Sequence, residues 1–578
     1  MMSATVNATR LGAPAERKET MENMQKAASV KAGLSRRNFL KIAGAGLAAA
    51  GLGGALTACG GNGGQQDQGT APAEAKTQVV VTMTPGSEPA AGFDPLVAWG
   101  CGEHVHEPLI QSTLITTDTD LNFVNDLATG YECSADGMTW TFTIRDDVKF
   151  TDGEPLTAED VAFTINGIIN SEASQADLSM VREAVAEDAA TVVLNMVKPN
   201  NALLYTLAVV GIVPAHAYGA DYGANPIGSG RYMLEQWDRG QQVILKANPD
   251  YYGDAPLMQR VVVLFTEEDA SLAAASSGQA DVAYTSAVFA DAAPQGCTLL
   301  NCASVDSRGI SLPCVPAGSP DKEQNGVSYA AGNDVTCNLA IRQAMNCSVD
   351  RGRMIEHVLN GFGTVAYSVS DGMPWSSADM KVETDVERGK KILADDGWEA
   401  GEDGILVKDG LRAEFDLLYS AGDSVRQALA MDFADQMGEL GIAVTVRGAS
   451  WDDIYVEQFC TPVLWGWGSN SPVELYELTH SQGWGNYASY GTPEIDAYLD
   501  EARAQADIAD SYPFYQKAQW DAETETGIAP QGASTWIWLA NVDHLYFQAE
   551  GLNVADQKPH PHGHGWSLVN NVDRWSWA

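Results

Sequence analysis

Two hydrophobic periodicities alternate along the chain after residue 79, and this alternation limits the fold to an α/β class. Trp140, Phe142 and Ile144 recur at every second position, which is the pattern of a strand with one buried face. Residues 425–440 instead repeat apolar side chains on one face of a helix, and Gly441 ends that helix before a second alternating stretch. Helix, glycine and strand in this order predict an α/β unit.

Three shorter patterns extend this prediction. The pair Asp136-Gly137 indicates a turn before the alternating strand. Thr157 and Asp160 form a capping-box pattern ahead of apolar residues at helical spacing, so a helix is expected to begin there. The continuous apolar run Val261–Phe265 predicts a strand buried on both faces.

The first 58 residues have the organisation of a secretory signal. The segment Ser35–Lys41 reads Ser-Arg-Arg-Asn-Phe-Leu-Lys and resembles the twin-arginine export motif. The apolar run Ile42–Leu56 follows it, and it is shorter than the roughly 20 residues that a membrane-spanning helix needs. Residues 1–58 are therefore predicted to be a twin-arginine-type lipoprotein signal peptide.

The end of this signal resembles a bacterial lipobox. Leu56-Thr57-Ala58 precedes Cys59, which the resemblance makes the lipidated first residue of the mature protein. Residues 59–78 are rich in Gly, Gln and Ala without apolar periodicity, so they are predicted to be a flexible tether. The protein is then expected outside the cytoplasm, on the cell membrane through its lipid.

Charge and cysteine content narrow the partners and the chemistry. The 34 Lys and Arg residues against 76 Asp and Glu give a net charge of −42, which excludes nucleic acid and anionic headgroups as partners. This acidity favours solubility or attracts cationic ligands. Besides Cys59 there are eight cysteines, an even number that permits disulfides, and we expect one local bridge within Cys297, Cys302 and Cys314.

Motifs of enzyme active sites are absent from the sequence after residue 59. It contains no Gly-x-Ser-x-Gly, His-Glu-x-x-His or Gly-x-x-x-x-Gly-Lys-Ser/Thr. His106-Glu107 is followed by Pro108, which stops the helix that a zinc protease would require. We therefore predict that the chain is not an enzyme and carries no cofactor.

Several sequence blocks resemble the peptide- and nickel-binding family, family 5, of ABC-importer solute-binding proteins. The resemblance covers about residues 79–555. The blocks that carry it are Trp140–Val161, Pro226–Tyr232, Asn248–Gly253, Ser277–Val282, Arg342–Asn346 with Asp350-Arg351, and Tyr487–Asp496.

The resemblance implies a two-lobed periplasmic-binding-protein-like fold of type II, in the large cluster with an extra subdomain on lobe I. The solute-binding domain would be residues 79–578. Lobe I would take about 79–108, 221–308 and 535–578, the subdomain about 109–220, and lobe II about 309–534. Ligand would bind between the lobes, which close over it by a hinge motion.

The family function then follows as an expectation. The chain would capture short peptides or related small solutes and deliver them to ABC permease and ATPase subunits. A receptor for nickel or another metal chelate is the alternative within the family. An enzyme or a sensory receptor on the same fold is a remote alternative.

The charged ligand contacts of the family are altered here. Peptide binders often hold the ligand's ammonium with an Asp after a Gly-Trp pair in lobe II, and Asn470 is its nearest counterpart without the charge. Residues 207–213 are uncharged where nickel-complex binders can place an Arg. The predicted ligand contacts in lobe I and lobe II are Trp99, His104, Trp465, Trp467, Ser469 and Asn470.

Histidines and tryptophans leave further alternatives open. His560, His562 and His564 alternate in one short segment, so they are candidate metal ligands, and a packed or solvated tail is the competing interpretation. Trp465 and Trp467 would stack on a ligand or pack in the core. For His104 and His106 we expect buried, hydrogen-bonded core residues, with metal ligation as the alternative.

Overall fold

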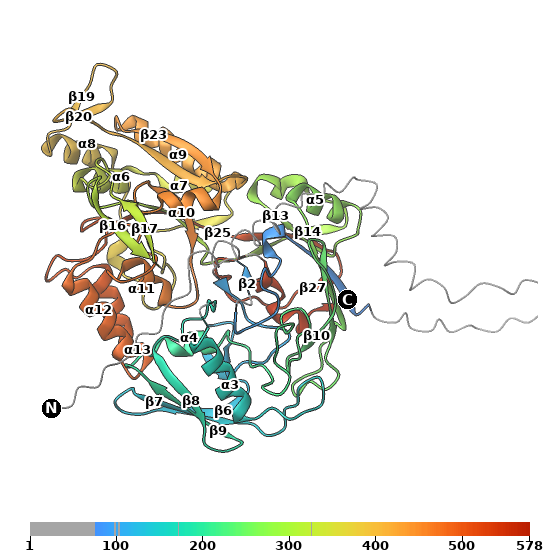
Figure 1. The fold of residues 1–578 in the computed structure, drawn as a ribbon. Coiled ribbons are helices and arrows are strands. Elements are labelled where there is room, and N and C mark those ends of the chain that lie inside the picture. The colour runs from blue at the N-terminus through green and yellow to red at the C-terminus, as the bar shows by residue number, and fades with distance from the viewer. Residues whose placement is uncertain (1–75, 98–99, 102–103, 172, 325, 564) are drawn as a thin grey trace, which may run out of the picture. The chain divides into compact units, whose positions relative to one another are not determined.

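The computed structural model describes residues 76–578 except 98–99, 102–103, 172, 325 and 564, and for residues 100–101 and 104–105 it describes the backbone alone. The predicted signal peptide, Cys59 and most of the predicted tether lie outside the described residues. Residues 74–578 form one compact unit, whose two large sheets appear in Figure 1. Among the described residues, no helix has both the length and the apolarity to cross a bilayer.

The first large sheet collects strands from three distant parts of the chain. Its central strand β1 pairs in parallel with β12, which on its other side meets β11. Successive residues Val261, Val262 and Val263 are all buried, so side chains on both faces of β12 are covered, which confirms the doubly buried strand predicted at Val261–Phe265. In order the strands are β10 (Tyr232–Asp238), β11 (Gln242–Ala247), β12 (Arg260–Phe265), β1 (Gln78–Met83), β13 (Val282–Thr285), β26 (His544–Ala549) and β14 (Cys297–Cys302).

The second large sheet contains the predicted helix–glycine–strand unit. Helix α9 (Ser424–Glu439) connects two parallel neighbours, β22 and β23, and Gly441 ends the turn after it at φ 82°. This unit confirms the α/β prediction made from residues 425–446. The strand order is β18 (Gly363–Val365), β25 (Trp536–Val542), β15 (Ser307–Ser311), β24 (Val463–Trp467), β22 (Glu414–Ser420) and β23 (Ala443–Ala449).

A four-stranded antiparallel sheet forms the third part of the unit. Trp140, Phe142 and Ile144 lie on one face of β7 and are buried against α3 and the neighbouring strands. The alternating strand predicted from these residues is confirmed. The elements are β6 (Ala128–Cys133), β7 (Thr139–Ile144), β9 (Thr191–Met196) and β8 (Val181–Ala186), with α3 (Ala158–Ile169) and α4 (Leu203–Leu207) beside them.

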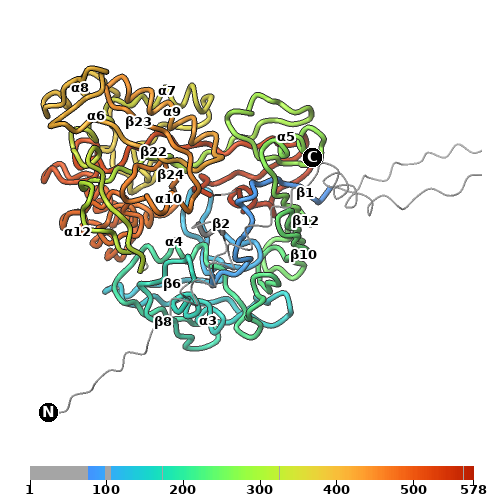
Figure 2. Tube along the Cα trace, turned by 45° about the horizontal axis from the view of Figure 1, so that its top comes forward, coloured from blue at the N-terminus to red at the C-terminus, as the bar shows by residue number. Residues whose placement is uncertain are grey.

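Further helices and short strands connect the sheets, and Figure 2 follows the chain through several of them. The remaining α-helices of the described residues are α5 (Glu268–Ser276), α6 (Leu339–Ser348), α7 (Arg351–His357), α8 (Val386–Asp395), α10 (Trp451–Glu457), α11 (Val473–Thr479), α12 (Pro493–Ala504) and α13 (Ile508–Gln519). The remaining strands are β2 (Gly100–Cys101), β3 (His104–Val105), β4 (Ile115–Thr117), β5 (Phe123–Asn125), β16 (Ser319–Gln324), β17 (Val327–Ala331), β19 (Glu399–Ala400), β20 (Leu406–Lys408), β21 (Leu411–Arg412), β27 (Leu552–Asn553) and β28 (Ser576–Trp577).

The chain crosses between the two large sheets twice, at residues 303–306 and at Asp543. Strand β14 enters the first crossing and β15 leaves it, while β25 enters the second and β26 leaves it. The sequence analysis assigned residues 535–578 to lobe I together with the first sheet, but the second crossing lies later, at Asp543. β25 extends the second sheet to Val542, because its backbone pairs with β15 and β18 rather than with the first sheet.

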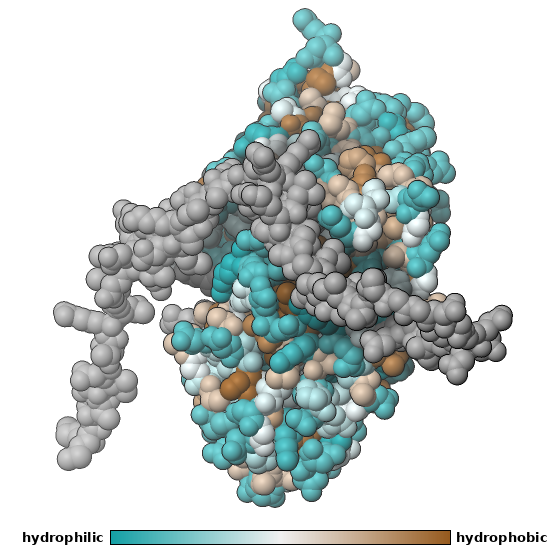
Figure 3. Space-filling model, turned by 90° about the vertical axis from the view of Figure 1, so that its right-hand side faces the viewer, coloured by the Kyte–Doolittle hydropathy of each residue, from teal (hydrophilic) through white to brown (hydrophobic). Residues whose placement is uncertain are grey.

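The second sheet has a different core on each face. Along β24 successive side chains alternate, so Trp465 and Trp467 enter an aromatic cluster while Leu464 packs with α9 on the other face. The first sheet and the four-stranded sheet have their own apolar clusters. On the solvent side, the face shown in Figure 3 is largely hydrophilic with scattered apolar residues.

The cysteines contradict the predicted local disulfide. Cys297 and Cys302 lie at opposite ends of β14, and Cys314 follows β15 in the other sheet. Because the strand holds the first two apart and the third belongs to a different sheet, none of them bridges. All seven cysteines whose side chains are described are free, namely Cys133, Cys297, Cys302, Cys314, Cys337, Cys347 and Cys460.

Helix α3 begins at the predicted capping box. The Thr157 side chain accepts from Glu159 N, and the Asp160 carboxylate accepts from Thr157 N at 2.9 Å. Replacing Thr157 by Ala removes this cap, so we expect the free energy of unfolding to fall by about 1 kcal/mol. Chemical denaturation measures the loss. Thr119→Ala, at an exposed turn, is the control, and an equal effect of both substitutions would contradict a role for the cap.

Candidate functional site

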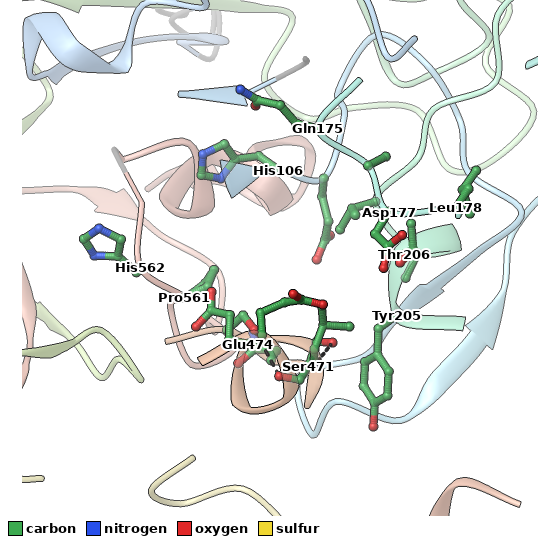
Figure 4. A pocket seen from close by; sticks show the side chains of 18 of the residues that line it. His106, Gln175, Asp177, Leu178, Tyr205, Thr206, Ser471, Glu474, Pro561 and His562 are labelled. Atoms are coloured by element: carbon green, nitrogen blue, oxygen red, sulfur yellow. Dashed lines mark hydrogen bonds between the residues drawn. The ribbon is translucent and has the colours of Figure 1, made fainter. Parts of the chain in front are cut away.

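A cavity of about 670 Å³ lies where three parts of the unit meet. One wall comes from residues 106–107 and 558–570 beside the first sheet. A second wall comes from residues 168–179 and 205–209 of the four-stranded region, and residues 467–484 of the second-sheet region form the third. Figure 4 shows Glu474 and Ser471 on one side, with His106, Asp177 and Tyr205 across from them.

The loop after β24 presents polar groups to this cavity. Gly468 has φ 130°, and a Cβ there would lie 1.8 Å from Val305 O, so a glycine is required at this turn. Its N–H donates to Glu474 Oε2 at 2.7 Å, which folds the glutamate back over the loop. Ser469 and Asn470 lie within this fold and line the cavity, in the part of the chain where ligand contacts were predicted.

Glu474 is the functional candidate that the sequence analysis missed. Burial raises the pKa of its carboxyl to about 7, the Gly468 N–H opposes this shift, and the negative charge of Asp306 adds to it. A carboxyl group with a pKa this high in a cavity marks a candidate binding residue. Glu474 follows Asn470 by four residues and lies in the first turn of α11. A carboxylate so near the counterpart of the family's Asp is the sequence signal that could have identified it.

Asn470 connects two walls of the cavity. Its Nδ2 donates to Pro559 O at 2.9 Å, which joins the second-sheet loop to the C-terminal segment. Its Oδ1 is buried and has no hydrogen-bond partner among the described residues. Asn470 therefore lines the cavity as an acceptor for an N–H group.

The two tryptophans predicted as ligand contacts have different surroundings. Trp467 lines the cavity, and its ring lies 5.5 Å from that of Trp484, which also lines it. Trp465 packs in the aromatic core, stacked on Tyr487 with ring centroids 4.3 Å apart, and its Nε1 donates to Ser311 Oγ at 3.0 Å. The structure thus places Trp465 behind the cavity wall, in agreement with the competing interpretation of a core aromatic.

The candidate metal ligands take part in a hydrogen-bonded cluster. His562 Nδ1 is 2.5 Å from Asp306 Oδ1, and His560 Nδ1 is 3.1 Å from His544 Nδ1. Both His560 and His562 also line the cavity, and burial lowers the pKa of each, so both are neutral near pH 7. Among the described residues, no group of three or more His, Cys, Asp or Glu side chains is arranged to hold a metal ion.

Three predicted contacts cannot be placed by their side chains. Trp99 and His564 lie outside the described residues. His104 forms β3, and its side chain is likewise outside them. Its neighbour His106 is buried and lines the cavity, and burial lowers its pKa to about 4, with His562 adding to the shift.

Asp306 organises the cluster behind the cavity. It lies in the first crossing between the sheets and is 3% exposed. Its carboxylate contacts Arg308 and His562, and it accepts a hydrogen bond from His544 Nε2 at 3.0 Å. Burial by itself raises the pKa of Asp306, but Arg308 and the two histidines outweigh burial and hold the pKa well below its usual range. The carboxylate is therefore charged at neutral pH.

The charges that line the cavity favour a cationic guest. Lys558 is the one Lys or Arg among the described lining residues, and its Nζ bonds to Glu107 Oε1. Glu477, another lining residue, is paired with a cation, since its Oε1 lies 3.4 Å from Nη2 of Arg503. Asp177 and Glu474 add two more carboxyl groups, so the walls attract positive charge.

Comparison with known proteins identifies relatives along most of the chain. Residues 122–488 match the model of bacterial extracellular solute-binding proteins, family 5. Protein XP55 of Streptomyces lividans is 32% identical over 533 residues, which covers 88% of this chain and 91% of XP55. The oligopeptide-binding protein AppA of Bacillus subtilis is 27% identical over 501 residues, covering 81% of this chain and 86% of AppA.

Solved structures share the fold. NikZ from Campylobacter jejuni, in complex with Ni(L-His), superposes with a TM-score of 0.72 at 22% identity, covering 87% of this chain and 99% of NikZ. AppA from Bacillus subtilis, in complex with a nonapeptide, gives a TM-score of 0.66 at 22% identity, covering 87% of this chain and all of AppA. These similarities confirm the predicted two-lobed periplasmic-binding-protein fold.

Proposed function

Because this chain belongs to the bacterial extracellular solute-binding proteins of family 5, we propose that it captures short peptides in the 670 Å³ cavity and delivers them to the permease of an ABC importer. The family is one of solute-binding proteins, and AppA is named as an oligopeptide-binding protein, which supports a receptor rather than an enzyme. The finer assignment to peptides rests on the cavity of this chain.

The observation that carries the peptide assignment is the carboxyl group of Glu474. It lies on the second-sheet wall, beside the loop where peptide binders of the family place their Asp. A peptide's terminal ammonium would make a charge-assisted hydrogen bond with this carboxylate. The Oδ1 atom of Asn470 would accept a second N–H, and Trp467 offers an aromatic face to the cation.

A metal chelate is the second candidate, and one observation favours it. His560 and His562 line the cavity, and NikZ, which shares the fold, is described in complex with Ni(L-His). However, Nδ1 of each histidine already has a partner in the Asp306 cluster. Binding a metal through these nitrogens would break bonds that hold the two crossings together, so peptide is the first choice.

The proposal includes a location outside the cytoplasm. Support comes from the family match and from the sequence of residues 35–59, where a twin-arginine motif precedes a lipobox. We propose that Cys59 carries the lipid that holds the protein on the membrane, beside its permease and ATPase partners. Mass spectrometry of the membrane-bound protein tests this: a mature chain without lipid on Cys59 would exclude the anchor.

Calorimetric titration tests the peptide assignment directly. We expect trialanine to bind at micromolar concentration or tighter, and N-acetylation to weaken it at least about tenfold because the amide no longer carries the charge that Glu474 attracts. Nickel with free histidine is titrated in parallel. If only the nickel complex binds, the protein is a chelate receptor, and equal affinity for both peptides would contradict the role of the ammonium.

A further inference from the structure

A second cavity adjoins the first. It has a volume of about 840 Å³ and lies between the first sheet and the four-stranded region, with Gln111, Arg231, Tyr251 and Ala255 in its walls. The two cavities share part of their lining. The shared residues are Glu107, Thr117, Ala208, Lys558 and Asn570.

An ion pair forms the partition between the two cavities. Lys558 Nζ donates to Glu107 Oε1, to Thr117 Oγ1 at 2.9 Å and to Thr117 O at 3.0 Å. An ammonium group has three protons to donate, and all three are used here. The pair therefore presents little net charge to either cavity, and its side chains form part of the boundary between them.

Unpartnered acceptors continue from the partition into the second cavity. Asn570 lines both cavities, is 8% exposed, and has an Oδ1 without a hydrogen-bond partner among the described residues. Gln111 lines the second cavity, is 2% exposed, and has an Oε1 that likewise lacks one. Its Nε2 donates to Phe93 O at 3.0 Å and to Tyr222 Oη at 3.1 Å, which fixes the amide orientation.

Buried acceptors of this kind are normally satisfied, so their occurrence in the lining of two adjoining cavities indicates the chemistry of a guest. Asn470 in the first cavity, Asn570 at the junction and Gln111 beyond it each offer an oxygen and require an N–H donor. A peptide backbone supplies N–H groups at regular spacing along an extended chain. A small solute confined to the first cavity would leave Gln111 without a partner.

We propose that the second cavity is a distal subsite that receives the far part of a longer peptide whose amino terminus lies at Glu474. The chain passes Lys558 and Glu107, and its N–H groups donate to Asn570 at the junction and to Gln111 beyond it. This inference rests on the proposed peptide function and adds the length of the substrate. Short peptides fill the first cavity alone.

Two peptides that share their first three residues test the inference: trialanine and an octapeptide that begins Ala-Ala-Ala. Ala255 is exposed and lines only the second cavity, so Ala255→Trp narrows this cavity without disturbing the core. Ala224→Trp is the matched control, because Ala224 is exposed and lines neither cavity. We expect Ala255→Trp to weaken the octapeptide about tenfold and to leave trialanine within about twofold. Ala224→Trp should change neither.

A photo-crosslinking octapeptide with benzoylphenylalanine at its last position gives an answer independent of any variant. Crosslinks within residues 111–126 or 251–257 support the distal subsite. Crosslinks confined to residues 168–179 and 467–484, or unchanged octapeptide affinity in Ala255→Trp, overturn it while leaving the peptide assignment intact. If wild type binds neither peptide, the proposed function fails and the subsite fails with it.

Discussion

Asp306→Asn is expected to lower the free energy of unfolding by about 3–5 kcal/mol, because it removes one partner of a buried ion pair and leaves the other charge uncompensated. Arg308 is 8% exposed and directs its guanidinium to Asp306. Arg426, also buried, lies near it and is itself paired with Asp423. Without the Asp306 charge, the two guanidinium groups would repel each other in a site that excludes water.

The position of Asp306 adds to this effect. Both crossings between the large sheets meet here, since Val542 N donates to Asp306 O at 2.9 Å and Ser304 Oγ donates to Val542 O at 2.6 Å. The C-terminal segment joins them through His562 and through His560, whose N–H donates to Ala303 O. Loss of the carboxylate therefore weakens the contacts that hold the crossings together.

Urea denaturation followed by tryptophan fluorescence measures the change. Asp403→Asn is the control, because Asp403 pairs with Arg412 at 2.8 Å on an exposed surface, where such pairs contribute up to about 1 kcal/mol. Adding Arg308→Met to Asp306→Asn should recover part of the lost stability, since the uncompensated charge is then absent. A loss no larger than that of Asp403→Asn would show that the pair does not stabilise the fold.

Local patterns were sufficient to predict several elements of the fold. Trp140, Phe142 and Ile144 specify one buried face, and the Thr157 cap begins α3 where the pattern placed it. The same patterns could not specify which sheet a strand joins. β25 is mostly apolar and almost wholly buried, so its sequence is compatible with either large sheet, and only its pairing with β15 assigns it to the second.

The candidate site was less predictable, for a physical reason. Sequence similarity directed attention to Asn470, the counterpart of a family carboxylate, whereas the structure brings Glu474 back over the same loop through the Gly468 N–H. Trp465 and Trp467 are equivalent in the sequence pattern and share one face of β24. Only Trp467, at the end of the strand, lines the cavity. The partners of His560 and His562 come from residues 306 and 544, more than 15 positions away along the chain, so no local motif could reveal them.

Glu474→Gln is expected to weaken binding of a short peptide by about 10- to 100-fold, which corresponds to the roughly 1.5–3 kcal/mol of a hydrogen bond to a charged group. The substitution keeps the size of the side chain and the acceptor for Gly468 N–H, and it removes only the negative charge. Calorimetric titration of trialanine at pH 8 measures the change. Glu439→Gln, at an exposed position on α9, is the control and should bind like wild type.

The pH dependence of binding identifies the group responsible. Because the pKa of Glu474 is about 7, its carboxyl loses its charge as the pH falls below 7, and the affinity of wild type for the peptide should fall between pH 8 and pH 6. The bound ammonium stabilises the carboxylate and so lowers this pKa in the complex. Glu474→Gln has no carboxyl to titrate there, so its affinity should not fall over the same range; only the peptide's amino group, whose pKa is about 8, still titrates, and it gains charge as the pH falls.

Stability separates this effect from misfolding. Folding raises the pKa of the Glu474 carboxyl from about 4.5 to about 7 and so favours its protonated form. Glu474 therefore destabilises the folded protein increasingly as the pH rises from about 4.5 to about 7. At pH 8, Glu474→Gln should therefore unfold at the same urea concentration as wild type or at a higher one. A variant that is fully stable and binds trialanine as wild type does, with the same dependence on pH, would show that the ammonium lies elsewhere in the cavity.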